Sequence, residues 1–116
     1  REMDYQVSRA GWTGDYPDPN TFLDMWTSWS QQNQTGWSKP EYDALIRKAA
    51  VTKDPAARLE VFQQAEEILM DELPIIPIYI YTRVYALHPA VKNWHANVLD
   101  HHPWKHVDLD LSKLKE

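Results

Sequence analysis

The alternation of hydrophobic and polar positions predicts a strand at the start of the chain and a shaped loop after it. Residues 3–12 alternate between apolar and polar side chains, which is the period-two pattern of a half-buried strand. Glycines and prolines then disfavour both the hydrogen-bonded ladder of a β-strand and a helix, so we predict a loop over residues 13–19. A short helix follows this loop, with Asn20 or Thr21 as its cap.

A second predicted loop carries two tryptophans. Residues 27–37 are polar and show no periodicity, and they contain Trp29 and Trp37. Aromatic side chains on a loop suggest ligand binding. The alternative, that both indoles pack back onto the core, agrees equally well with the sequence.

Two amphipathic helices come next, and we predict that they form a helical hairpin. Ser38 and Glu41 have the spacing of a capping box at the start of the first helix. Asp54 followed by Pro55 marks the start of the second. Apolar residues recur every three or four positions, which gives each helix one buried side. These sides comprise Tyr42, Leu45, Ile46 and Ala49 on the first helix and Leu59, Phe62, Ala65, Ile68 and Leu69 on the second.

The last part of the chain combines a hydrophobic strand with an irregular tail. Residues 74–87 are rich in β-branched and aromatic residues and apolar on both parities as far as Tyr81, which is typical of a strand covered on both faces. Pro77 places this strand near an edge or a bulge. The tail contains turns and a short strand over residues 104–109, without a compact core of its own. The predicted class is therefore mixed α/β: strand, helical hairpin, strand and irregular tail.

Composition excludes several classes of function. The chain has 116 residues, at most one domain, and its 12 basic and 17 acidic residues give a net charge of −5 without a basic run. It therefore lacks the electrostatic footprint of a protein that binds nucleic acid. The absence of cysteine excludes disulfides and thiolate catalysis. No apolar run reaches the roughly 18 to 20 residues of a membrane span. No targeting segment is visible, and we expect the chain to be a piece of something longer.

The sequence offers little support for catalysis or for a cofactor. All five histidines lie in the tail. A metal site would combine His102 and His106 with Asp100 or Asp108, but Pro103 disfavours the helix that this histidine spacing requires. No nucleophile elbow, phosphate-binding glycine loop or zinc-protease motif is present. We therefore expect a protein that is not an enzyme.

The strongest candidate site centres on Asp15, in the stretch GWTGDYPDP. Aspartates in such turns commonly cap backbone amides, which also weakens a general acid and base role for Asp15 with Asp18. The surroundings favour another interpretation, because Trp12 leaves the same strand end and Arg9 lies just upstream. An acid, a base and flat aromatic walls, to which Tyr81 of the apolar strand would contribute, suit a zwitterionic peptide.

Three stretches resemble, in order and spacing, the C-terminal quarter of periplasmic oligopeptide- and dipeptide-binding proteins, the substrate-binding components of ABC importers. They are SRAGWTGDYPDPNTFLDMW, NQTGWSKPEYDALIRKA and AARLEVFQQAEEILMDELPIIPIYIYTRVYALHPAVKNW. The resemblance runs from about residue 4 to residue 109. Each motif is modest by itself, but three motifs in register are a strong indication.

The resemblance implies a role for five residues. In the family, the aspartate of the G-W-x-x-D-Y segment, here Asp15, pairs with the α-ammonium group of the ligand. Trp12 would wall the pocket, and the backbone at Thr13 would bond the ligand's main chain. Arg9 stands where some members have an arginine that meets the carboxylate of short peptides. Tyr81 matches a tyrosine that lines the cleft near the hinge.

The resemblance also implies a two-lobed fold that closes on its ligand by hinge motion. Residues 1–82 would belong to the lobe that carries the amine anchor, and residues 83–116 would cross the hinge to the other lobe. The implied partners are an oligopeptide or dipeptide, an ABC permease in the inner membrane and the missing lobe of the same protein, with no nucleic acid. The implied compartment is the periplasm, or the extracellular side with a lipid anchor in a Gram-positive organism.

Two other interpretations remain open at this point. In one, the chain is a small structural or protein-interaction domain whose hairpin and aromatic surface bind a partner protein, and Asp15 is only a cap. In the other, it is a metal-dependent hydrolase that uses the tail histidines and needs bound zinc. Ligand length and side-chain preference are not encoded here, because surfaces of the missing lobe would set them, and solutes other than peptides also fit.

Overall fold

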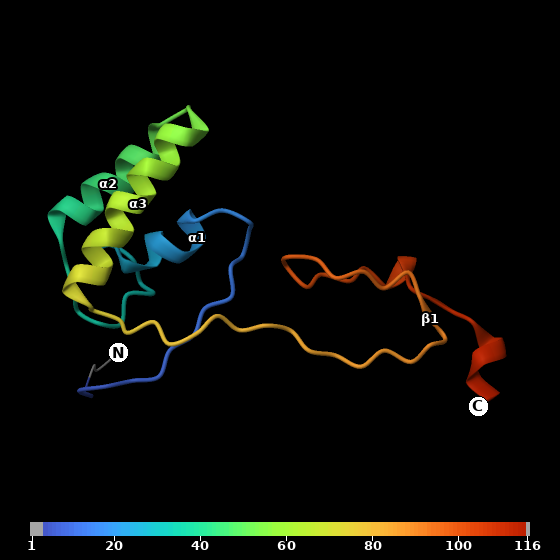
Figure 1. The fold of residues 1–116 in the computed structure, drawn as a ribbon. Helices are drawn as coiled ribbons and strands as arrows, with labels where there is room; N and C mark the ends of the chain where they lie inside the picture. The colour runs from blue at the N-terminus through green and yellow to red at the C-terminus, as the bar shows by residue number, and fades with distance from the viewer. Residues whose placement is uncertain (1–3, 116) are drawn as a thin grey trace. The chain divides into compact units, whose positions relative to one another are not determined.

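The computed structural model describes residues 4–115, which contain three α-helices and one small antiparallel sheet (Figure 1). The chain divides into two compact units, with the boundary between Pro77 and Ile78. The first unit contains α1 (Asn20–Leu23), the 3₁₀-helix η1 (Asp24–Trp26), α2 (Pro40–Val51) and α3 (Pro55–Glu72). The second contains β1 (Val91–Lys92), η2 (Trp104–His106), β2 (Asp108–Leu109) and η3 (Leu111–Lys115).

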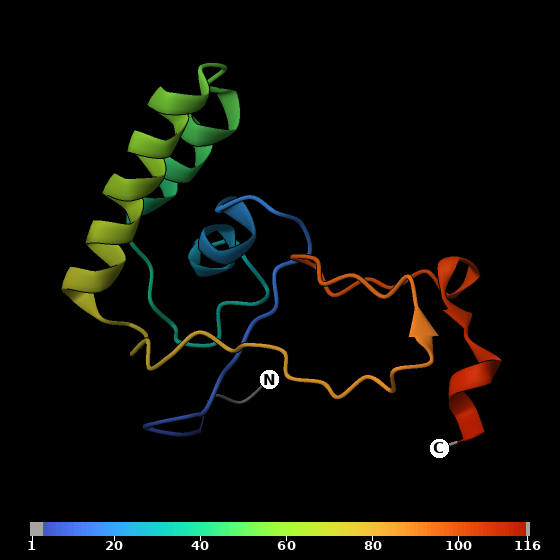
Figure 2. The same cartoon turned by 45° about the vertical axis from the view of Figure 1, so that its right-hand side comes forward.

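The predicted helical hairpin is confirmed, since α2 and α3 lie side by side in two views (Figure 1, Figure 2). Asp54 caps α3 as predicted, with its carboxylate accepting a hydrogen bond from the amide of Ala57 at 2.8 Å. The predicted capping box of α2 is wrong. Pro40 takes the first helical position, which it favours, so Lys39 rather than Ser38 becomes the N-cap and no side chain caps the helix.

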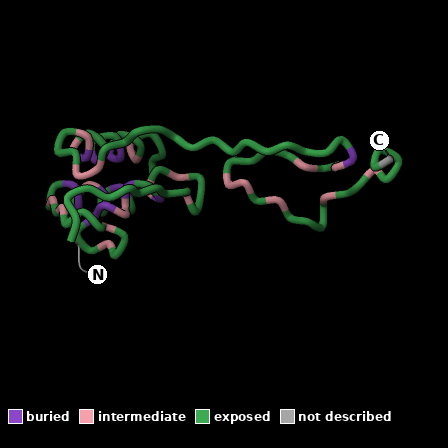
Figure 3. Tube along the Cα trace, turned by 90° about the horizontal axis from the view of Figure 1, so that it is seen from below, coloured by how far each residue is buried: buried purple, intermediate pink, exposed green. Residues whose placement is uncertain are grey.

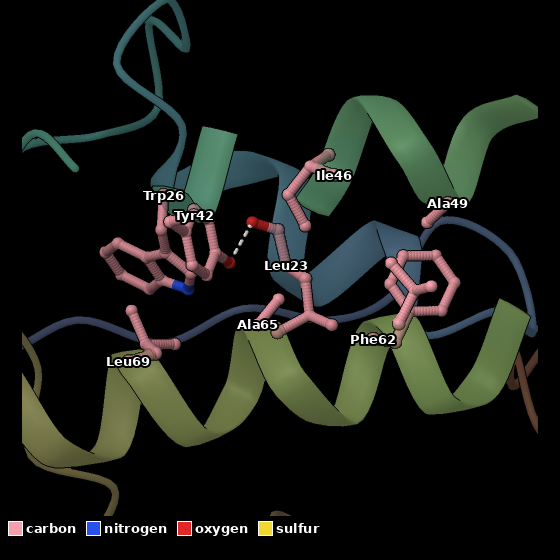
Figure 4. Packing of buried hydrophobic residues seen from close by; sticks show 9 residues of the cluster. Leu23, Trp26, Tyr42, Ile46, Ala49, Phe62, Ala65 and Leu69 are labelled. Atoms are coloured by element: carbon pink, nitrogen blue, oxygen red, sulfur yellow. Dashed lines mark hydrogen bonds between the residues drawn. The ribbon is translucent and has the colours of Figure 1, made fainter. Parts of the chain in front are cut away.

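The core lies where α1 and η1 meet the hairpin (Figure 4). Tyr42 is fully buried, and its hydroxyl donates a hydrogen bond to the carbonyl oxygen of Leu23 at 2.6 Å. Burial raises the pKa of Tyr42, so the hydroxyl stays protonated and remains a donor. The buried apolar residues of this core are Leu23, Trp26, Tyr42, Ile46, Ala49, Val61, Phe62, Ala65 and Leu69.

One predicted core position on α3 is wrong. Leu59 is 55% exposed, whereas Val61, which the prediction left out, is buried. Successive helical residues are about 100° apart, so Leu59 lies on nearly the opposite side of the helix from Val61. The row formed by Val61, Ala65 and Leu69 faces the core and excludes Leu59.

Neither long strand predicted from the sequence forms within the described residues. Residues 4–12 and 74–87 carry no ladder, and every residue from 76 to 89 is exposed (Figure 3). Met3, which the first predicted strand included, lies outside the described residues. A strand needs a neighbouring strand to pair its backbone groups, and an alternating or apolar pattern alone does not supply one.

The second unit is organised around the antiparallel pair β1 and β2, in which Val91 lies opposite Leu109. The strand predicted over residues 104–109 is shortened to β2, because its first three residues form η2 after Pro103. Beside this sheet, His102 stacks on Trp94 with ring centroids 3.7 Å apart. Among the helices of residues 4–115, none is both long and apolar enough to cross a membrane.

Candidate functional site

The loop that carries Asp15 is fixed by hydrogen bonds to the start of α1. The backbone amide of Asp15 donates to the hydroxyl of Thr21 at 3.1 Å. The carboxylate of Asp18 accepts a hydrogen bond from the amide of Asn20 at 2.9 Å. The N-cap of α1 is Pro19, so the prediction that Asn20 or Thr21 caps this helix is wrong. The side chain of Thr21 serves the loop instead.

Asp18 is also the partner of Arg58, which comes from the first turns of α3. The guanidinium donates two hydrogen bonds to the two carboxylate oxygens, at 2.6 and 2.9 Å. These hydrogen bonds hold the pKa of Asp18 below its usual value. Arg58 further donates from Nε to the carbonyl oxygen of Ala49 at 3.3 Å and lies over the ring of Phe62, 4.6 Å from its centroid. Asp18 is therefore the aspartate of this turn that has the capping and ion-pair role.

Trp12 and Asp15, two of the predicted site residues, line one shallow hollow of about 300 Å³. Asp24 and Trp29 line it as well, so two carboxylates and two indoles face the same space. The remaining lining residues are Met25, Ser30 and Gln32. Among the described residues that form the hollow, none is basic. The hollow therefore suits a cation with an apolar neighbour.

Asp24 was not identified from the sequence, yet its environment is the most unusual in the hollow. Burial raises the pKa of Asp24, an effect that a hydrogen bond from the side-chain amide of Asn20 at 3.0 Å partly offsets. The negative charge of Asp15 raises it further. A cation between these two carboxylates would favour their ionised forms. The only signal in the sequence is an acid placed among apolar residues in FLDMW.

The other three predicted site residues do not line this hollow. Arg9 and Thr13 are exposed residues of the first unit, upstream and downstream of Trp12. Tyr81 belongs to the second unit, where it is 62% exposed and its ring lies edge-on to Tyr79 with centroids 4.5 Å apart. Their roles therefore stay predictions.

The two loop tryptophans differ in their surroundings: the packing alternative is confirmed for Trp37, and ligand binding by Trp29 stays a prediction. Trp37 packs against the core, edge-on to Tyr42 at 5.1 Å, and its indole nitrogen donates to Glu72 at 2.8 Å. Trp29 is half exposed, lines the hollow and lies under the guanidinium of Arg47, 4.2 Å from the ring centroid. Trp29 is thus the loop aromatic with access to a ligand.

Four of the five tail histidines line a separate hollow of about 430 Å³ in the second unit: His95, His101, His102 and His106. One of them, His102, is held by Asp100, whose oxygen lies 2.8 Å from Nε2. The same aspartate pairs with Nε of Arg83 at 3.2 Å. Within the described residues, no group of three histidine or acidic side chains is arranged to hold a metal ion. Residues 4–115 therefore give the zinc hypothesis no ligand set.

Three bacterial binding proteins are similar to this chain. The dipeptide-binding protein DppE of Bacillus subtilis (strain 168) is 36% identical over 109 residues, which cover 94% of this chain and 19% of DppE. The oligopeptide-binding protein OppA of the same organism is 41% identical over 85 residues, 72% of this chain and 16% of OppA. The periplasmic murein peptide-binding protein MppA of Escherichia coli (strain K12) is 38% identical over 93 residues, 80% of this chain and 17% of MppA.

These similarities confirm the resemblance that the three sequence stretches indicated. The chain spans less than a fifth of the length of these curated relatives. No protein-family model matches it. The relatives are solute-binding proteins rather than enzymes. This chain belongs to the family of bacterial peptide-binding proteins of ABC importers.

Proposed function

We propose that this chain carries the amine anchor of a peptide-binding protein that delivers its ligand to an ABC permease. Asp15 pairs with the α-ammonium group of the peptide, and Trp12 forms the apolar wall beside it. The observation that carries the proposal is the hollow in which Asp15 and Asp24 meet two indoles without a basic lining residue. A free ammonium group entering this hollow compensates both carboxylates, whereas an acetylated terminus cannot.

Three further residues complete the proposed ligand contacts. The backbone at Thr13, next to Trp12, bonds the main chain of the peptide. Arg9 meets the carboxylate of a short peptide, and Tyr81 lines the cleft near the hinge. Amine, main chain and carboxylate are common to all peptides, so these contacts bind a peptide with little dependence on its side chains.

The chain is proposed to form part of a two-lobed protein of the periplasmic-binding type. Residues 1–82 belong to the lobe with the amine anchor, and residues 83–116 cross the hinge toward the other lobe. The exposed isoleucines Ile78 and Ile80, at 84% and 92%, then contact the remainder of the same protein. The names of two relatives, MppA of Escherichia coli and OppA of Haemophilus influenzae, support a location in the periplasm. The proposed alternative is the outside of the cell, with a lipid anchor, in a Gram-positive organism.

The test is to replace Asp15 with asparagine in the complete protein and to measure peptide affinity by calorimetry. We expect Asp15→Asn to weaken trialanine binding by about 1.5 to 3 kcal/mol, the usual worth of a hydrogen bond to a charged group. N-acetyl-trialanine should bind poorly to the parent protein and no worse to the variant.

Asp71→Asn, an exposed aspartate on α3, is the matched control and should leave both affinities unchanged. If the parent binds free and acetylated trialanine equally well, Asp15 is not an amine anchor.

A further inference from the structure

We propose that the Asp18–Arg58 ion pair is a positioning device for the amine anchor, which fixes Asp15 and Asp24 in the hollow before the ligand arrives. This inference rests on the proposed function of Asp15. Binding sites that are rigid in their bound conformation lose less entropy on association, so a pre-set anchor binds more tightly and more selectively. The pair itself does not touch the ligand. It acts through the loop.

The pair joins segments that are 40 residues apart in the chain. Both terminal nitrogens of Arg58 bond to Asp18, one to each carboxylate oxygen, and both side chains are only 29% exposed. A two-pronged contact fixes orientation as well as distance, which a single ammonium group cannot do. The loop is therefore held to α3 in one defined orientation.

Arg58 is itself held on the other side. Its Nε donates to the carbonyl oxygen of Ala49 near the end of α2, and its guanidinium carbon lies over the buried ring of Phe62, 4.6 Å from the centroid. Three donors of one guanidinium thus connect the loop with both helices of the hairpin. Lysine at this position keeps the charge but loses this geometry.

A short chain of hydrogen bonds leads from the pair to Asp15. The backbone carbonyl of Asp18 accepts from the amide of Thr21 at 3.2 Å. Thr21 is buried, and its hydroxyl accepts from the amide of Asp15 at 3.1 Å. The position of Asp15 therefore follows the position of Asp18.

A second branch leads from the same pair to Asp24. Oδ1 of Asp18, which accepts from Arg58 at 2.9 Å, also accepts from the amide of Asn20. The side chain of Asn20 then donates to Asp24 at 3.0 Å. One ion pair is thus linked by hydrogen bonds to the backbone of Asp15 and to the carboxylate of Asp24, which a contact that served only stability would not need to be.

The test compares two ion pairs of the complete protein. Asp18→Asn and Arg58→Lys disrupt the positioning pair, and Glu72→Gln disrupts the Lys39–Glu72 pair, which also joins α3 to a distant segment but does not contact the loop. The readout is the ratio of the dissociation constants of N-acetyl-trialanine and trialanine, measured by calorimetry. Urea unfolding confirms that each variant is folded under the assay conditions. A purely structural role lowers stability and leaves this ratio unchanged.

We expect Asp18→Asn and Arg58→Lys each to reduce this ratio of dissociation constants about fivefold or more, because groups that share a hydrogen-bond network are energetically coupled. Glu72→Gln should leave the ratio unchanged. If Asp18→Asn does not fold, the test rests on Arg58→Lys. This variant keeps a positive charge beside Asp18 and loses only the two-pronged geometry. If the folded variants keep the parent's ratio of dissociation constants while Asp15→Asn brings that ratio close to one, the positioning role is overturned. Asp15 then still stands as the amine anchor. A parent protein without any preference for the free amine would overturn the anchor and, with it, this inference.

Discussion

At the scale of single residues, two aspartates three positions apart have different uses. The carboxylate of Asp18 is compensated by Arg58 and by the amide of Asn20, whereas Asp15 lines the hollow. The sequence left open whether Asp15 was a cap or an anchor, because both acids stand in one proline-rich turn and the partner of Asp18 lies 40 residues away. Only the folded chain assigns the cap.

At this scale we expect Asp24→Asn to raise stability and to lower affinity. Burial, aided by the charge of Asp15, raises the pKa of Asp24, so its ionised form costs folding free energy at every pH above that raised value. Asparagine removes this cost and still accepts the hydrogen bond from Asn20. The melting temperature at pH 7 should therefore rise, while trialanine binding weakens.

The sign of this effect can be checked by pH. Below the ordinary pKa of an aspartate, the carboxyl of Asp24 is protonated in both the folded and the unfolded chain, and the gain in melting temperature should vanish. Calorimetric melts at pH 7 and pH 3 measure this difference. A variant that melts lower than the parent at pH 7 would contradict the prediction.

At the scale of secondary structure, the elements set by local signals were predictable. Asp54 and Pro55 mark the start of α3, and the apolar stripes identify the buried sides of both helices apart from Leu59. The strands were not predictable in the same way, because a ladder depends on a neighbouring chain segment that no local pattern specifies. The hollow was predictable only in part for the same reason. It is formed by three segments. Trp12 and Asp15 were identified as site residues and Trp29 as a loop aromatic, whereas Asp24 was missed.

Among the contacts between elements, the hydrogen bond from Tyr42 to Leu23 joins α2 to α1. Tyr42→Phe removes this donor and leaves a buried carbonyl oxygen without it, so we expect the free energy of unfolding to fall by about 1 to 2 kcal/mol. Urea denaturation measures the loss.

Tyr5→Phe is the matched control for this contact. Tyr5 also donates to a backbone carbonyl, that of Gln34, at the same 2.6 Å, but this bond is exposed. Water can replace it, so the cost should stay below about 0.5 kcal/mol. Equal losses in the two variants would show that burial of the Tyr42 hydrogen bond adds nothing.

At the scale of the whole molecule, the buried apolar residues lie in the first unit except for Ala90, as far as residues 4–115 show. The segment around Ile78 and Ile80 has a strand-like composition without a strand or a covering surface. The sequence predicted that such a segment is covered on both faces, and residues 4–115 do not supply that cover. A larger protein that supplies it is the interpretation proposed above. This interpretation agrees with the fact that the chain spans less than a fifth of the length of its curated relatives.

For the chain of 116 residues produced by itself, we therefore expect self-association through this exposed apolar segment. Light scattering should give a mass above 13.7 kDa that rises with concentration. Replacing Ile78 and Ile80 together with serine should lower that mass. The single substitution Leu59→Ser, at an exposed apolar residue of α3, should leave it unchanged. A monodisperse monomer at all concentrations would contradict the prediction.

The half-exposed indole of Trp29 has a practical consequence for studies of this site. Its ring is covered on one face by Arg47 and borders the acidic hollow, so the local electric field at the indole depends on what occupies that space. Trp37, packed against Tyr42, is shielded from such a change. Occupancy of the hollow can therefore be followed as a change in the intrinsic fluorescence of Trp29 and of Trp12, which lines the same space, without attaching any dye.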